Sequence, residues 1–115
     1  MGKRARRRGQ AAVPIAPESE YRRGGDDVLV LRGALSPASR REYADLAGRV
    51  REDRFHRQVE FLFERLAARW EVAGVEYGPK EVLPRLRMAS EDERAWVRDA
   101  LREHVREWFP DVAAP

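Results

Sequence analysis

The chain contains no cysteine and no threonine, and it has only two histidines and four serines. Without cysteine it can form no disulfide bond, no thiolate metal site and no cysteine nucleophile. None of the serines stands in the Gly-x-Ser-x-Gly turn that presents a hydrolase nucleophile, and no glycine-rich phosphate-binding motif occurs. We therefore expect no enzyme activity, no cofactor, no metal and no small-molecule substrate.

Long hydrophobic runs are also missing. The longest aliphatic run is Val28–Leu31, whereas a helix needs about 20 apolar residues to cross a bilayer. The 115 residues are the length of one domain, and a hydrophobic content of 43% is enough for a compact core. We expect a soluble cytoplasmic protein without a membrane partner.

Positive charge is concentrated near the N-terminus. Residues 1–25 carry seven Lys/Arg and two Asp/Glu, whereas residues 26–115 carry sixteen Lys/Arg and eighteen Asp/Glu. The first segment is rich in glycine and proline and poor in apolar residues, which predicts a disordered basic tail over 1–25 and a folded domain over 26–115. Five bases of the tail are candidates for non-specific attraction to RNA or DNA through counterion release: Lys3, Arg4, Arg6, Arg7 and Arg8. The chain has 21 arginines and two lysines, a ratio that a GC-rich bacterial genome also produces without selection for binding. The alternative is therefore a tail that only increases solubility.

The periodicity of the domain predicts a mainly α fold, namely a compact four-helix domain. Four helices are expected, at about 36–47, 52–73, 79–86 and 90–109. The first begins with Ser36 as N-cap before a proline, and the last begins with the capping box of Ser90 and Glu93. Gly74, in a left-handed conformation, is expected to end the long second helix. Residues 28–31 predict a short strand, which needs a partner, and residues 75–77 are the candidate for a small two-stranded ribbon.

The two histidines are the candidates for chemistry. His56 has Asp53 three residues before it and Glu60 four residues after it, so these side chains share one side of a helix turn. This is half of a carboxylate-histidine metal site, but Leu101 stands where the second half would need an acid. His104 lies within an apolar helix face, where it is either a proton switch or a histidine bonded to a backbone carbonyl or water. An ion pair at His56 and a structural role for His104 are favoured.

The last two predicted helices resemble a helix-turn-helix in outline. A short helix, the turn Met88–Ser90 and a longer helix follow one another, and in that motif the start of the second helix contacts DNA. Here that first turn carries Glu91, Asp92 and Glu93, which would repel phosphates. Ordinary packing of two helices is therefore favoured over groove recognition.

Two large side chains lie away from the predicted core faces. Phe61 belongs to a second stripe of the long helix, and Trp96 is offset by about 100° from the core face of the last helix. Both are candidates for contact with a protein partner or a second copy. The sequence thus predicts a non-catalytic interaction module with a helical core for protein contact and a basic arm. Two alternatives are a DNA-binding regulator and a small enzyme using His56 with Asp53 or Glu60.

Overall fold

The computed structural model describes residues 17–46 and 51–115, with side chains from residue 56 onward in the second stretch. Within these residues the chain forms four strands and four helices. In chain order they are β1 (Glu18–Arg23), β2 (Asp27–Arg32), α2 (Pro37–Asp45), α3 (Arg51–Leu66), β3 (Ala67–Val72), β4 (Val75–Tyr77), α4 (Val82–Arg87) and α5 (Glu91–Trp108). The strands form one antiparallel sheet in the order β1-β2-β3-β4. The predicted mainly α class is therefore wrong, and the fold is mixed α/β.

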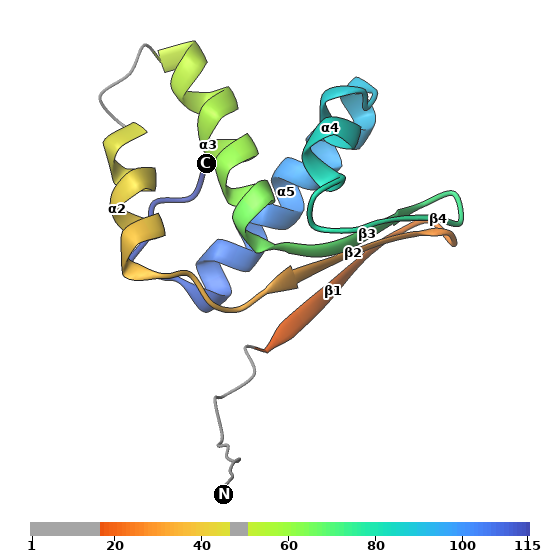
Figure 1. The fold of residues 1–115 in the computed structure, drawn as a ribbon, viewed down its shortest axis with the longest axis horizontal. Coiled ribbons are helices and arrows are strands. Elements are labelled where there is room, and N and C mark those ends of the chain that lie inside the picture. The colour runs from red at the N-terminus through yellow and green to blue at the C-terminus, as the bar shows by residue number, and fades with distance from the viewer. Residues whose placement is uncertain (1–16, 47–50) are drawn as a thin grey trace, which may run out of the picture.

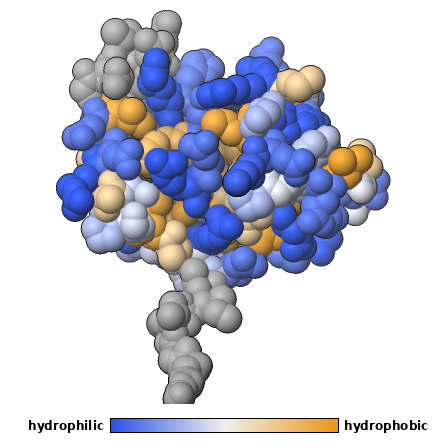
Figure 2. Space-filling view, viewed as in Figure 1, coloured by the Kyte–Doolittle hydropathy of each residue, from blue (hydrophilic) through white to orange (hydrophobic). Residues whose placement is uncertain are grey.

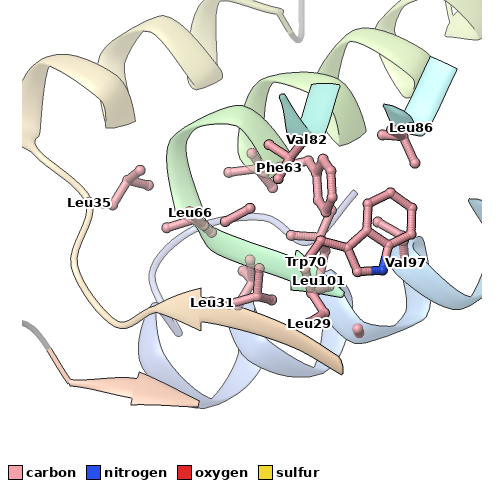
Figure 3. Close-up of a cluster of buried hydrophobic side chains, with 14 of the residues drawn as sticks. Leu29, Leu31, Leu35, Phe63, Leu66, Trp70, Val82, Leu86, Val97 and Leu101 are labelled. Atoms are coloured by element: carbon pink, nitrogen blue, oxygen red, sulfur yellow. The ribbon is translucent and has the colours of Figure 1, made fainter. Parts of the chain in front are cut away.

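The helices lie together on one face of the sheet, as Figure 1 shows. Leu29 and Leu31 point from β2 into the layer between sheet and helices, where Trp70 of β3 joins them (Figure 3). They meet fully buried side chains of the helices, among them Phe63, Leu66, Val82, Val97 and Leu101. Burial of each such side chain contributes roughly 1.5–3 kcal/mol, so this layer is the core that fixes the sheet against the helices.

The opposite face of β2 is covered by charged side chains. Val28 and Val30 are only 6% and 2% exposed, although both lie on the face away from the core cluster. Glu20 of β1 and Arg69 of β3 stand opposite Val30 on its two sides, and their ion pair of 3.8 Å crosses above it. Further ion pairs extend this charged cover, Arg22–Glu20 at 3.2 Å and Arg69–Glu71 at 3.6 Å. The aliphatic stems of these residues shield the valines, which explains a continuously apolar strand in a two-layer fold.

Strand β1 is the first correction to the sequence prediction, because it lies inside the segment assigned to the disordered tail. Glu18–Arg23 pairs along its whole length with β2, and Gly24, with φ +63°, takes part in the hairpin turn. Ser19 and Tyr21 are bonded to Trp108 and His104 of α5, at 3.0 and 2.9 Å. Backbone pairing and polar contacts hold this strand, and apolar periodicity reveals neither of them.

Strand β3 is the second correction. The predicted helix over 52–73 stops at Leu66, and Ala67–Val72 continues as a strand between β2 and β4. The segment Ala67-Ala68-Arg69 has a high helix propensity. Pairing with β2 outweighs this preference, because the buried backbone groups of β2 need hydrogen-bond partners on both sides. Gly74 has the expected positive φ of +82°, but together with Ala73 at +51° it forms a hairpin turn and does not cap a helix.

Several local predictions are confirmed. Residues 28–31 lie in a strand, although its partners are β1 and β3 and not 75–77, which pairs with β3. Ser36 caps α2 by accepting a hydrogen bond from the Ser39 amide, and Ser90 forms the expected capping box. The short helix begins at Val82, later than predicted. Among the described residues, no helix combines the length and apolarity that a bilayer crossing requires.

Candidate functional site

The structure describes two of the predicted site residues, Phe61 and Trp96. Lys3, Arg4, Arg6, Arg7 and Arg8 lie outside the described residues. Phe61 and Trp96 are half-buried and pack against the core cluster. They belong to different helices, α3 and α5, and their proposed role in protein contact stays a prediction.

Phe61 lies in a shallow hollow between α3 and α4. Its ring is 6.3 Å from that of Tyr43, and the Arg65 guanidinium lies 4.5 Å from the ring centre. The hollow has a volume of about 180 Å³, and Glu60, Leu83 and Arg87 also line it. The ring is thus held between a buried aromatic side chain and a cation, an arrangement that favours a fixed position for Phe61.

The structure describes only part of the carboxylate arrangement that the sequence places around His56. It is exposed on α3, and the Asp53 side chain lies outside the described residues. Glu60 forms a two-bond ion pair with Arg87 of α4, at 3.0 and 3.3 Å, and this contact raises the pKa of Arg87. No group of three or more His, Cys, Asp or Glu side chains in the described part of the chain is placed to hold a metal ion.

His104 is fully buried and forms two hydrogen bonds. Its Nε2 lies 2.7 Å from the carbonyl oxygen of Arg32, so Nε2–H is the donor and Nδ1 is left as the acceptor for the Tyr21 hydroxyl, 2.9 Å away. Burial lowers the pKa of His104, although the Arg32 carbonyl and Glu107 oppose the shift. Burial also raises the pKa of Tyr21 to about 12, with Glu103 and Glu107 adding to the effect. This geometry is that of a neutral structural histidine that fastens β1 and β2 to α5.

A groove of about 470 Å³ lies between β4 and α4. Tyr77, Pro84 and Met88 supply its apolar lining, and Lys80, Glu81 and Arg85 complete it. Met88 is 83% exposed, an unusual degree for a large apolar side chain. Figure 2 shows a mostly hydrophilic surface with small apolar patches, one of them at the right, where Figure 1 places the β3–β4 hairpin.

Arg85 sets the shape of this groove. Its guanidinium lies 5.3 Å from the ring centre of Trp70 and 5.7 Å from that of Tyr77. The same group forms a 3.0 Å ion pair with Glu93, whose other carboxylate oxygen accepts the Ser90 amide of the capping box. These hydrogen bonds lower the pKa of Glu93. The wall of the groove is therefore tied both to the core and to the start of α5.

The start of α5 carries an acidic surface. Glu91 and Asp92 are exposed in its first turn, and Arg94 donates to the backbone carbonyl of Arg87 at 3.1 Å. Further along α5, the side chains of Val97 and Leu101 are buried in the core. An acidic first turn suits the positive helix terminus but repels a DNA backbone.

Comparison with known protein families, with curated proteins and with solved structures finds no match for this chain. The candidate site therefore depends on the geometry alone. The groove could not be recognised from the sequence, because residues 75–77 were expected to pair with residues 28–31, and β3, the strand with which they pair, was predicted as part of a helix. Met88 stood in a predicted turn, and nothing in its local sequence marks it as exposed.

Proposed function

We propose that this protein is a non-catalytic interaction module, and that the groove between β4 and α4 binds an extended peptide segment of a protein partner. The observation that carries the proposal is the exposed Met88 beside Tyr77 and Pro84 in one groove. Flexible, polarisable methionine side chains and aromatic rings are typical of surfaces that accept peptides.

An extended peptide is favoured because β4 is an edge strand. It pairs with β3 and, within the described residues, with no second strand. A peptide that pairs with the free backbone of β4 would place alternate side chains toward Tyr77 and Met88. The exposed Lys80 at the rim favours a peptide with an acidic residue.

A library of random displayed peptides tests this proposal against the full chain. We expect enrichment of peptides with alternating apolar residues and at least one acid. Met88→Glu should lower the affinity of the enriched peptides by roughly tenfold or more, as for a central interface residue. The melting temperature should not change, because Met88 is largely exposed.

Ala44→Glu is the matched control. Ala44 is exposed on α2 and does not line the groove, so the variant adds the same charge elsewhere on a helical surface. It should bind like the unaltered protein. Failure to enrich any peptide, or equal binding by the Met88→Glu variant, would contradict the proposal.

The basic arm adds non-specific attraction to RNA or another polyanion in this proposal. Because β1 belongs to the fold, the arm has to be tested by substitution in the full chain and not by deletion up to residue 25. Replacement of Lys3, Arg4, Arg6, Arg7 and Arg8 by Gln should reduce the slope of log affinity against log salt by about three to four for single-stranded RNA. Equal affinity and equal slope for both proteins in an anisotropy titration would exclude the arm as the contact.

The two alternatives from other classes make different predictions. A sequence-reading regulator would bind one DNA sequence far more tightly than random DNA, which footprinting on genomic fragments measures. An enzyme would use His56 with Asp53 or Glu60. The Asp53 side chain lies outside the described residues, and Glu60 would have to leave its ion pair with Arg87. The acidic first turn of α5 favours the interaction module over the DNA-binding regulator. The ion pair of Glu60 with Arg87 favours it over an enzyme that uses Glu60.

A further inference from the structure

Strand β1 offers a second interaction surface, at the other edge of the sheet. It is six residues long and pairs with β2, and within the described residues it has no strand on its outer side. An edge of this length presents a row of backbone donors and acceptors that can pair with another strand. This surface is separate from the groove, so a role for it goes beyond the proposed peptide binding.

The backbone register identifies the groups on the free edge. The Gly33 amide donates to the Pro17 carbonyl at 2.6 Å, and these two residues continue the β1–β2 register. In an antiparallel pair, every second residue directs both its N–H and its C=O toward the partner strand. Ser19 and Tyr21 therefore point their backbone groups to β2, and those of Glu18, Glu20 and Arg22 point outward.

The charges along this edge are ordered. The strand reads Glu-Ser-Glu-Tyr-Arg-Arg, with its acids in the first half and its bases in the second. We propose that β1 pairs with β1 of a second copy of this chain, antiparallel and centred on Tyr21, so that Glu20 of each copy stands opposite Arg22 of the other. A two-fold axis through the sheet then joins the two four-stranded sheets into one.

This register is selected by the charges. A shift of the centre to residue 20 would also set Glu18 opposite Arg22, but it would place two copies of Glu20 opposite each other. A shift to residue 22 would place two copies of Arg22 opposite each other. Like charges in directly opposite positions destabilise a sheet, whereas opposite charges stabilise it. A centre between two residues would pair an even-numbered position of one copy with an odd-numbered position of the other. Side chains of directly paired residues point to the same face of a sheet, so the helices of the two copies would then lie on different faces.

Light scattering over a concentration series measures the association. We expect a dimer for the full chain. Arg22→Glu sets two carboxylates opposite each other at two places in each dimer, so the dissociation constant should rise by roughly tenfold or more. The swap Glu20→Arg/Arg22→Glu restores opposite charges at both positions and should restore the dimer. Circular dichroism on each variant confirms that the sheet is intact.

A monomer at millimolar concentration would overturn the proposal. So would a folded Arg22→Glu variant that dimerises as well as the unaltered chain. If Arg22→Glu does not fold, the charge swap and disulfide cross-linking decide the question.

The absence of cysteine permits a direct test of the register. In the proposed dimer, position 20 of one copy faces position 22 of the other, about 5.5 Å apart between Cα atoms, within disulfide range. Two copies of the same position would be roughly 8–9 Å apart, which is too far. A covalent dimer should form when the Glu20→Cys and Arg22→Cys proteins are mixed and oxidised, and not with either alone. Equal cross-linking of a single variant, or none in the mixture, would refute this register.

Discussion

The bond between Tyr21 and His104 should be one of the polar contacts that stabilise this fold most. We expect Tyr21→Phe to lower the free energy of unfolding by about 1–2 kcal/mol. The phenyl ring keeps the packing of Tyr21, so the change removes only the hydroxyl that donates to Nδ1 of His104 at 2.9 Å. His104 is 0% exposed, so water cannot replace the lost donor. The expected loss combines a net hydrogen bond of about 0.5–1.5 kcal/mol with the cost of an unpaired buried acceptor.

Urea denaturation followed by circular dichroism measures this loss, and a thermal scan should show a melting temperature lower by about 4–8 °C for each kcal/mol. Tyr43→Phe is the matched control. Its hydroxyl donates to the Ala113 carbonyl at 2.6 Å, and Ala113 is exposed, so water can replace that donor. The control should therefore lose less than about 1 kcal/mol. Equal losses in the two variants would refute the reasoning.

A double-mutant cycle separates the bond from its surroundings. Tyr21→Phe and His104→Leu each remove one partner, and the double variant removes both. If the two side chains interact directly, the combined loss should be smaller than the sum by about 0.5 kcal/mol or more. Strict additivity would show that the two groups act independently and that β1 is held to α5 by other contacts.

Two further predictions concern α5. Burial lowers the pKa of His104 in the folded protein. As the pH falls, the unfolded chain therefore takes up a proton before the folded protein does. The free energy of unfolding should keep its His104 contribution above about pH 6.5 and lose it progressively at lower pH. His104→Gln should remove this part of the pH profile in urea titrations, and a profile that keeps its slope near pH 6 would contradict the assignment. Trp96→Ala should weaken association measured by light scattering if Trp96 contacts a partner, whereas a lower melting temperature of the monomer with unchanged association would show that this half-buried ring belongs to the core.

The helices could be predicted where a local interaction defines them. Ser36 before Pro37 and Ser90 with Glu93 are caps within a few residues of sequence, and both are formed. The same holds for the apolar run of β2, whose strand character depends only on its composition. Such features need no knowledge of the rest of the fold.

Two of the four strands, β1 and β3, could not be predicted, because the side-chain contacts of β1 lie far along the chain and β3 continues the apolar spacing of a helix. Tyr21 is 83 residues from His104, and Ser19 is 89 residues from Trp108. Trp70 follows Leu66 at helical spacing, so the apolar pattern of residues 66–70 fits a helix as well as a strand. The pattern therefore gives no sign that a strand begins at Ala67. The apolar content of β2 was the available indication that strands were missing, since a fully buried strand needs pairing on both sides.

The candidate site was missed for the same reason. Tyr77 reaches α4 only because β4 pairs with β3, and Met88 is exposed although the next residue, Ala89, is buried. For His104, in contrast, the expected backbone partner is confirmed, because Nε2 lies 2.7 Å from the Arg32 carbonyl oxygen, whereas the choice between a structural role and a proton switch stays a prediction.

The position of β1 links the basic arm to the proposed dimer. In the antiparallel pair centred on Tyr21, residue 18 of one copy stands opposite residue 24 of the other, so the two arms leave the sheet about 20 Å apart. A long polyanion can contact both arms at once, and the second contact is then intramolecular. Arg22→Glu should therefore weaken binding to long RNA more than binding to an oligonucleotide too short to span both arms. An equal loss for both lengths would show that the arms act singly, even if the chain dimerises.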